Sequence, residues 1–331
     1  METRCLACRW TTLGSFIVVI VATAVLPELF EAGTLKAQTP NSGSQTKSRN
    51  ATSAATQEPA PPDHYDPDDA KTWPDVINED RTIVIREQQF TVHFYRPRQA
   101  GAAIPAIYAC GDGGWRGLAP RTAAQMAHMG FAVAGIDSKV YLRQFSSLTD
   151  PLTIKQLAHD YVDIAKPLRS YANVDSTTPV YVYGWSLGAG FAIAVGSDTA
   201  TRANWAGIVS IGLPRQNQLV SGVGGNHASL SVEANARYGF RSQDLIALVS
   251  PVPLVMIQSS SDTASPPKVG RALFDNAKDP KRYILIEANN HRFSGAREEF
   301  YSALGTAVKW MHEGGKESNS AQTTFKTKSS N

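Results

Sequence analysis

The stretch Pro179-Val-Tyr-Val-Tyr-Gly-Trp-Ser-Leu-Gly188 decides the fold of this chain. Its first half is an apolar run typical of a buried strand, and its second half has the pattern Gly-x-Ser-x-Gly, with Ser186 between Gly184 and Gly188. A strand that turns sharply into a helix at such a serine strains the serine backbone, and larger side chains at the two glycine positions would collide. The pattern therefore predicts a nucleophile elbow, which raises the Ser186 hydroxyl above a sheet and directs a helix N-terminus at it.

The same five-residue pattern also occurs by chance, so a loop of small residues is the alternative interpretation. The surrounding sequence favours the elbow, because strand-like and helix-like runs alternate on both sides of it. The expected strands are residues 81–85, 90–95, 104–109, 131–136, 180–183, 206–211, 253–257 and 282–286, and the expected helices are residues 118–129, 152–171, 190–197 and 297–312. This alternation predicts an α/β fold with a mainly parallel, eight-stranded sheet and helices on both faces. Ser186 follows the fifth strand, and this number and order resemble the α/β-hydrolase fold.

Two later loops supply the partners that a serine nucleophile needs. A serine hydroxyl is weakly nucleophilic at neutral pH, so it requires a base within hydrogen-bond reach and an acid that orients the base. Asp262 follows the run 253–257 after four polar residues, and His291 follows the run 282–286 after four more residues. In α/β-hydrolases the acid comes after the seventh strand and the histidine after the eighth. The spacing therefore predicts a catalytic triad of Ser186, Asp262 and His291.

Each triad partner also has a purely structural interpretation. Asp262 lies in a segment rich in serine and proline, where it could cap a turn or a helix, and His291 could be an exposed loop histidine. The histidines at positions 93, 128, 159 and 312 fall in a predicted strand, in predicted helices or near the tail. His227, in a glycine-rich insertion, is the one serious rival for the base.

An oxyanion hole needs two backbone N–H donors, one from the residue after the serine and one from the loop after the third strand. Leu187 is the first donor by position. The segment Cys110-Gly-Asp-Gly-Gly-Trp115 should supply the second, because its glycines allow the backbone to approach an oxyanion closely, and we assign it to the N–H of Asp112. A plain flexible turn is the alternative for this segment. The Asp112 carboxylate would oppose a developing negative charge, so we expect it either to turn away or to bind a cationic group of the substrate.

The two ends of the chain differ in composition from its centre. Residues 1–31 carry two arginines before an apolar run from Leu13 to Leu26, which is short for a bilayer span and predicts a signal peptide, with an uncleaved membrane anchor as the alternative. Residues 32–70 and 314–331 are rich in small and polar residues, which predicts a disordered linker and a disordered tail. One hydrolase domain is expected over residues 71–313, in a protein that is periplasmic or secreted, or tethered to the inner membrane.

Composition argues against several other functions. The formal net charge is only +3, so the chain lacks the strongly basic character of a nucleic-acid-binding protein. No HExxH, paired CxxC or phosphate-binding GxxxxGK motif occurs, and no metal or cofactor is expected. Cys110 ends an apolar run, so we expect it to be a small packing residue, with a reactive thiol as the alternative.

Three motifs narrow the resemblance to a smaller group. They are Gly111-Asp-Gly-Gly-Trp115, Gly130-Phe-Ala-Val-Ala-Gly-Ile-Asp137 with Tyr141-Leu142, and Tyr183-Gly-Trp-Ser-Leu-Gly-Ala189. Together these motifs are similar to those of the bacterial virulence-associated VirJ/AcvB family. The resemblance implies that the family's serine corresponds to Ser186, and its acid and histidine to Asp262 and His291.

The same resemblance implies an exported serine hydrolase. AcvB-type proteins of the family hydrolyse the aminoacyl ester of lysyl-phosphatidylglycerol at the outer face of the inner membrane, which implies an aminoacylated phospholipid as the substrate and partner of this chain. The chain departs from the family at Trp185, Leu187 and Gly190, where tyrosine, phenylalanine and aspartate are usual. We expect one hydrolase domain behind a linker, without the duplicated domain of AcvB.

We therefore expect an exported hydrolase of carboxylic esters. Two alternatives stay open: a non-catalytic interaction protein of the envelope or of secretion built on a hydrolase scaffold, and a thioesterase or peptidase. Residues 214–248, between the sixth and seventh strands, are expected to cover the active site as a lid, with an ordinary surface crossover as the alternative.

Overall fold

The computed structural model describes residues 72–221, 237–315 and 323–326. The expected signal or anchor at 1–31 and the expected linker at 32–70 lie outside these residues, as does the centre of the expected lid, which includes His227. All described residues fall within one contact unit of the chain, residues 59–331. Within the described ranges, no helix has both the length and the hydropathy needed to cross a membrane.

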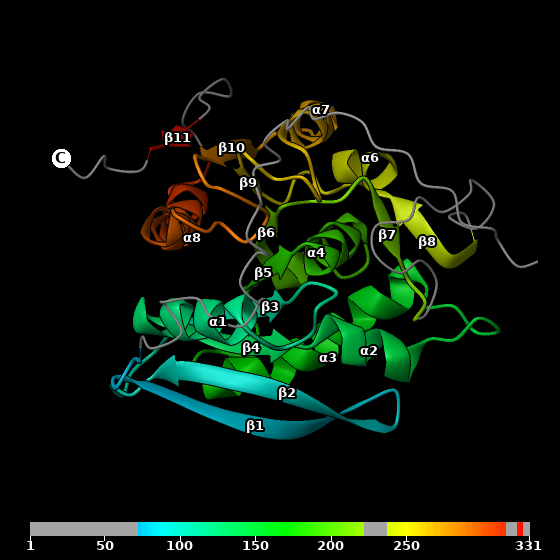
Figure 1. Ribbon diagram of the computed structural model, residues 1–331. Coiled ribbons are helices and arrows are strands. Elements are labelled where there is room, and N and C mark those ends of the chain that lie inside the picture. Colours follow the sequence, from blue (N-terminus) through cyan, green and yellow to red (C-terminus); the bar gives the residue numbers. More distant parts are fainter. Residues whose placement is uncertain (1–71, 222–236, 316–322, 327–331) are drawn as a thin grey trace, which may run out of the picture. The chain divides into compact units, whose positions relative to one another are not determined.

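A nine-stranded sheet runs through the domain and is parallel except at one edge (Figure 1). Its strands in chain order are β1 (Val76–Ile85), β2 (Gln88–Pro97), β3 (Ile104–Ala109), β4 (Phe131–Ile136), β5 (Val180–Trp185), β6 (Trp205–Ile211), β9 (Leu254–Ser259), β10 (Lys281–Ile286) and β11 (Thr323–Phe325). The spatial order is β1-β2-β4-β3-β5-β6-β9-β10-β11, in which β1 and β2 are antiparallel to their neighbours and all later pairs are parallel. Because parallel strands end at a common edge, the loops after β3, β5, β6, β9 and β10 open on one side of the sheet.

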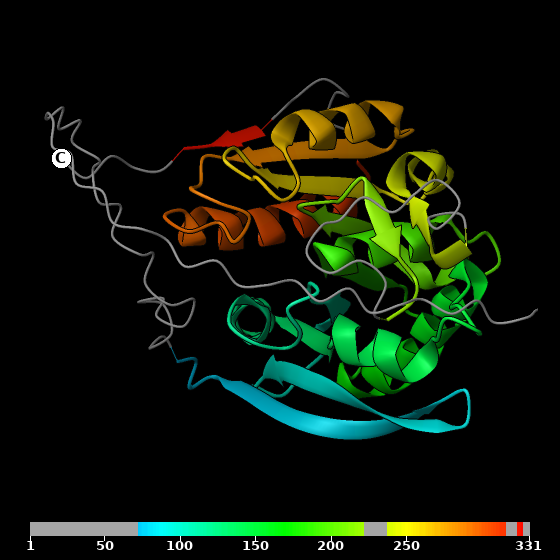
Figure 2. The ribbon, with the colours of Figure 1, turned by 45° about the vertical axis from the view of Figure 1, so that its right-hand side comes forward.

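Helices cover both faces of this sheet (Figure 2). Side chains of α1 (Leu118–His128) and α8 (Arg297–His312) belong to the core on one face. The core on the other face includes side chains of α2 (Ser138–Phe145), α3 (Ile154–Tyr171), α4 (Leu187–Ser197) and α7 (Pro267–Asn276). A small antiparallel pair, β7 (Gln216–Gln218) and β8 (Gly239–Arg241), precedes the short helix α6 (Ser242–Leu245), and 3-10 turns lie at Arg202–Asn204 and Ile246–Leu248.

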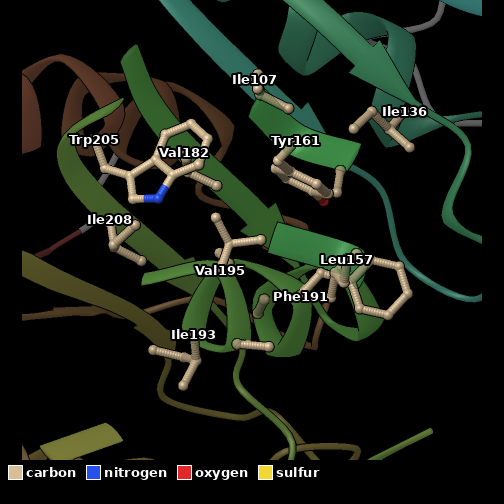
Figure 3. Close-up of a cluster of buried hydrophobic side chains, with 14 of the residues drawn as sticks. Ile107, Ile136, Leu157, Tyr161, Val182, Phe191, Ile193, Val195, Trp205 and Ile208 are labelled. Atoms are coloured by element: carbon tan, nitrogen blue, oxygen red, sulfur yellow. The ribbon is translucent and has the colours of Figure 1, made fainter. Parts of the chain in front are cut away.

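The strand and the helix that flank Ser186 are buried along their whole length. Every residue of β5 and of α4 is buried, as expected for a central parallel strand and for a helix that is apolar on all sides. Figure 3 shows the α4 side chains Phe191, Ile193 and Val195 among apolar side chains of β5, β6 and α3. Ser186 is therefore held between two elements that packing keeps in place.

The structure confirms the mainly parallel α/β architecture and the order of all eight expected strands, and it adds a ninth. The additional strand β11 lies within the expected disordered tail and pairs in parallel with β10. Backbone pairing with the exposed edge of β10 explains this strand, because the tail sequence itself has no strand-like pattern. The sequence pattern also does not predict α2, which has only eight residues, or α7, which starts at Pro267 in a segment whose composition indicates a loop.

Candidate active site

Ser186 lies at the sharp turn between β5 and α4. Its backbone has φ 56° and ψ −116°, a conformation that residues with side chains rarely adopt. A Cβ atom at Gly184 would lie 1.9 Å from the carbonyl oxygen of Gly188, and one at Gly188 would lie 2.1 Å from that of Ala109. The turn therefore has no space for a side chain at either position, which is the physical reason for the pattern Gly-x-Ser-x-Gly.

Asp262 and His291 meet in the loops that follow β9 and β10. His291 Nδ1 lies 2.7 Å from Asp262 Oδ2, and the Ser265 N–H donates a hydrogen bond of 2.7 Å to Asp262 Oδ1. The Asp262 side chain is 0% exposed and that of His291 is 16% exposed. Since a carboxylate can only accept hydrogen bonds, Nδ1 carries the proton in this contact and Nε2 is the nitrogen left for a further partner.

His291 also contacts the residue that precedes the serine. The Trp185 indole Nε1–H donates to the His291 carbonyl oxygen at 3.3 Å, and the two rings lie 5.4 Å apart between centroids. The Nε2 atom of His291 is buried and has no hydrogen-bond partner among the described residues, so the bond to the Ser186 hydroxyl is not formed in this structure. Catalytic hydrogen bonds of this kind often tighten only when substrate is bound.

Gly212 packs directly against the pair of Asp262 and His291, a position that the sequence motifs do not predict. This residue follows β6 with φ +58°, and a Cβ atom there would lie 2.8 Å from His291 Cε1 and 3.4 Å from Asp262 Oδ2. Both the backbone conformation and the lack of space therefore require glycine. A glycine at the end of a predicted parallel strand, on the same edge as the serine turn, was the only sequence signal for this role.

The loop after β3 crosses close to the serine. A Cβ atom at Gly111 would lie 3.2 Å from Ser186 Cβ and 3.4 Å from the Trp185 ring. Asp112 is exposed, and Leu187 is the first residue of α4, where backbone N–H groups lack partners within the helix. Neither the Asp112 N–H nor the Leu187 N–H donates to a backbone carbonyl in the parts of the chain that the structure describes. Both N–H groups are therefore available for an oxyanion.

Asp137 and Trp115 hold the loop after β3 in place. The sequence motifs do not predict this supporting role for either residue. Asp137 caps α2, because its Oδ1 accepts hydrogen bonds of 3.0 Å from the N–H groups of Lys139 and Val140. Its Oδ2 accepts a bond of 3.0 Å from the Trp115 N–H. The Trp115 ring stacks on that of His93 at 4.7 Å between centroids. One carboxylate thus connects the loop to a helix N-terminus, and one indole anchors it on the sheet.

Gly190 is one of the positions where the chain departs from the VirJ/AcvB pattern, and its surroundings explain the departure. A Cβ atom at Gly190 would lie 1.9 Å from Asn217 Oδ1. Asn217 is buried on β7 and donates from Nδ2 to the Ser242 hydroxyl at 2.8 Å. An aspartate at position 190 therefore has no space here, because an amide from the segment after β6 fills it.

The other candidate residues that the structure describes do not join the site. His93 pairs with Asp80, His128 pairs with Asp75, and the side chains of residues 159 and 312 are exposed on helices. Cys110 is buried, as expected for a packing residue, and burial raises the pKa of its thiol to about 12. A cysteine with so high a pKa stays protonated and is a poor nucleophile. Within residues 72–221, 237–315 and 323–326, no group of three or more His, Cys, Asp or Glu side chains could hold a metal ion.

The family comparison agrees with the resemblance that the sequence motifs indicate. Residues 103–220 match the family model described as bacterial virulence protein (VirJ). The matched stretch contains the loop after β3 and Ser186, and it ends before Asp262 and His291. No curated protein matches the chain.

Solved structures share the fold at low sequence identity. A dienelactone hydrolase from Klebsiella pneumoniae superposes with a TM-score of 0.52 and 12% identity, covering 72% of this chain and 99% of its own. Est1E from Butyrivibrio proteoclasticus has a TM-score of 0.51 and 13% identity, covering 71% and 99%. A dienelactone hydrolase from Anabaena variabilis has a TM-score of 0.50 and 18% identity, covering 72% and 98%. The chain therefore has the α/β-hydrolase fold.

Proposed function

We propose that this chain, which has the α/β-hydrolase fold and matches the VirJ family model over residues 103–220, is a serine hydrolase that cleaves carboxylic esters. The proposal depends above all on the hydrogen bond between His291 Nδ1 and Asp262 Oδ2, at the same sheet edge as the strained Ser186. A buried carboxylate that orients an imidazole, with the other ring nitrogen unpaired, supplies the base that a serine nucleophile needs.

In the proposed reaction, the Ser186 hydroxyl attacks the carbonyl carbon of the ester while His291 Nε2 takes its proton. Asp262 stabilises the imidazolium that forms and keeps Nδ1 as the protonated nitrogen. The negative charge on the former carbonyl oxygen is bound by the N–H groups of Leu187 and Asp112. His291 then donates its proton to the leaving alcohol, which leaves an acyl group on Ser186. Water, deprotonated by the same imidazole, releases the acid and restores the serine.

For the substrate, we propose an ester whose acyl group carries a positive charge, and the lysyl ester of phosphatidylglycerol is the candidate that the family resemblance implies. The exposed carboxylate of Asp112 supports this choice, because Asp112 follows Gly111, where a Cβ atom would lie 3.2 Å from Ser186 Cβ. A carboxylate at this position attracts a cationic acyl group and repels an anionic one. The apolar N-terminal run, which supports export, would place the hydrolase on the outer side of the inner membrane, where this lipid is accessible.

The test compares the wild type with Ser186→Ala and with Ser302→Ala, an exposed serine on α8 that serves as the control. We expect Ser186→Ala to lower the hydrolysis of a chromogenic short-chain ester at least about 1,000-fold and to abolish labelling by a fluorophosphonate, because the attacking atom is removed. Release of lysine from vesicles that contain lysyl-phosphatidylglycerol should fall in parallel. The control should keep both activities.

The outcomes separate the competing functions. If the wild type neither turns over esters nor reacts with the fluorophosphonate, the chain is a non-catalytic interaction protein on a hydrolase scaffold, and the proposal is wrong. If esters are cleaved but lysyl-phosphatidylglycerol is not, the hydrolase proposal stands and its substrate is wrong. If a thioester or a peptide with the same acyl group is cleaved faster than the ester, the triad acts as a thioesterase or a peptidase instead.

A further inference from the structure

Gln258 is a polar residue at an apolar position of the sheet. It lies on β9, where Leu254 and Met256 point to the same face and belong to the core that α7 covers. Its side chain is almost completely buried, with the residue 1% exposed. Burying an amide in such a place costs free energy unless it forms hydrogen bonds, so the contacts of this side chain reveal its role.

The amide nitrogen of Gln258 is surrounded by acceptors. Nε2 lies 3.0 Å from Asp262 Oδ2, 2.8 Å from the Ser265 carbonyl oxygen and 3.4 Å from that of Ser259. A carboxylate and two carbonyl groups can only accept hydrogen bonds, so the nitrogen, and not the oxygen, of the amide must face them. The two amide protons are therefore used on Asp262 and on the loop that carries it.

The oxygen end of the amide is also constrained. A Cβ atom at Gly270, on α7, would lie 2.7 Å from Gln258 Oε1 and 3.2 Å from the Tyr283 hydroxyl. The absence of a side chain at Gly270 therefore leaves the space that the Gln258 amide oxygen occupies. Burial raises the pKa of Tyr283 to about 12, so this hydroxyl stays neutral beside the network.

We propose that Gln258 is a positioning residue of this site: its amide fixes the Asp262 carboxylate and, through it, the orientation of the His291 ring. Asp262 Oδ2 receives both the Gln258 amide and the His291 Nδ1–H, while Oδ1 receives the Ser265 N–H. With three donors in fixed directions, the carboxylate has one orientation, and the imidazole that binds it has one as well. The kinetic part of this inference rests on the proposed hydrolase function, whereas the orientation of His291 is independent of it.

The charged and titratable groups around the network are few. Asp262 and His291 form its centre, Tyr283 comes from β10, and α7 contributes Arg271 and Asp275, which pair with each other at 3.0 Å. A second carboxylate in place of the Gln258 amide would add negative charge next to Asp262. Such a charge favours the protonated imidazole over the neutral one.

Two substitutions test the inference. Gln258→Met keeps the length and apolar contacts of the side chain but removes the amide, and we expect kcat to fall about 10- to 100-fold with KM unchanged, because the base is misaligned while no substrate contact is lost. Gln258→Glu should move the acid limb of the pH profile of kcat/KM upward by roughly one pH unit. The NMR titration of the His291 ring in the free protein should show the same shift.

The control is Gln125→Met on α1, which makes the same chemical change at a buried amide that accepts a bond from the Trp73 indole, away from the triad. It should lower the free energy of unfolding and leave the pH profile and the His291 titration unchanged. If either Gln258 variant does not fold, Gly270→Ala takes its place. The new Cβ would lie 2.7 Å from Gln258 Oε1 and displace the amide, so kcat should fall as in the Gln258 variants.

The inference is overturned if the folded Gln258 variants, or Gly270→Ala in their place, keep the wild-type kcat, pH profile and His291 titration. A wild-type protein without esterase activity would contradict the proposed function and leave the NMR titration to decide the inference. A fall in stability alone, with unchanged His291 behaviour, would also overturn it, because that is the result of a purely structural amide.

Discussion

At the scale of single residues, the candidate active site depends as much on glycines as on the side chains of the proposed triad. Gly184 and Gly188 allow the turn at Ser186, and Gly111 allows the loop after β3 to approach it. Gly212 has a different function, since its missing Cβ leaves the space that the His291 ring occupies. The chemistry therefore requires empty space at specific points next to the reacting groups.

Replacing Gly212 by alanine should show this requirement. The new Cβ would lie 2.8 Å from His291 Cε1, so the ring must move, and the φ of +58° adds a backbone strain of about 1 kcal/mol for a residue with a side chain. We expect Gly212→Ala to lower kcat/KM for the ester at least about 10-fold and to slow the reaction with a fluorophosphonate. Steady-state kinetics and labelling rates measure both effects.

Gly130→Ala is the matched control for this prediction. Gly130 also has a positive φ, of +97°, but nothing lies within 4 Å of the position of its Cβ. This variant should lose stability through backbone strain and keep its activity. Equal loss of activity in both variants would mean that strain, and not contact with His291, explains the effect.

At the scale of elements, the parallel strands bring distant parts of the sequence to one edge. The loops after β5, β9 and β10 carry Ser186, Asp262 and His291, and β5, β6, β9 and β10 are neighbours in that order. The strand pattern of the sequence predicts these loops well, because alternating apolar runs and breaks follow directly from burial. The pattern does not predict α2 or α7, since both are short and depend on local capping or on contacts made in the fold.

The N-terminus of α2 offers a test of how a helix supports the loop after β3, which carries Asp112, the proposed oxyanion donor. Asp137→Ala removes the cap of the helix and the bond to the Trp115 N–H together. We expect a loss of about 1 kcal/mol in the free energy of unfolding, as for other N-caps, and in addition a fall in kcat of about 10-fold, because the donor N–H of the loop loses its alignment. Urea unfolding and ester kinetics give the two quantities.

Thr153→Ala provides the control, because Thr153 caps α3 in a capping box with Gln156. It should cost a similar free energy of unfolding without changing kcat. A normal kcat in Asp137→Ala would show that the Trp115 ring alone holds the loop.

At the scale of the whole domain, an ion pair between a partly exposed arginine and a buried carboxylate connects the edge hairpin to the helical layer. Arg86, in the turn between β1 and β2, lies 2.8 Å from Asp160 of α3, and the Tyr141 hydroxyl of α2 donates to the same carboxylate. Burial raises the pKa of Asp160, and the bonds from Tyr141 and Arg86 lower it in part. Because the folded protein holds this proton more tightly than the unfolded chain does, the contribution of Asp160 to stability decreases as the pH rises through its folded pKa.

Removing the arginine should make this pH dependence steeper. Arg86→Met leaves the Asp160 carboxylate with less compensation and raises its pKa further, so we expect a loss of roughly 1 to 3 kcal/mol near pH 7, less than for a fully buried pair because Arg86 is partly exposed. The difference from the wild type should be smaller at about pH 5 than near pH 7, because the Asp160 carboxyl group is protonated to a larger extent at the lower pH. Urea unfolding at both pH values measures it.

Lys166→Ala, which breaks an exposed pair with Asp163 on α3, should change stability by less than about 0.5 kcal/mol at either pH. A loss in Arg86→Met that is the same at both pH values would contradict the linkage to Asp160. In a protein that also carries Asp160→Asn, the loss of stability caused by Arg86→Met should no longer depend on pH, because the titrating carboxyl group is absent.

The sequence by itself determined the strand order along the chain, the serine turn and the two later loops, because burial periodicity and the steric demands of a sharp turn are written in local residues. It also indicated the family resemblance that the match over residues 103–220 confirms. The tertiary structure alone decided which contacts surround these residues: the amide of Gln258 beside Asp262, the space at Gly212 beside His291, the Asp137 carboxylate bound to the loop after β3, and the pairing of β11 with β10. All but the first are contacts between segments far apart in the chain, and the Gln258–Asp262 bond, although it spans only four residues, depends on the conformation of the loop after β9. No local pattern encodes a contact whose partner is set by the fold around it.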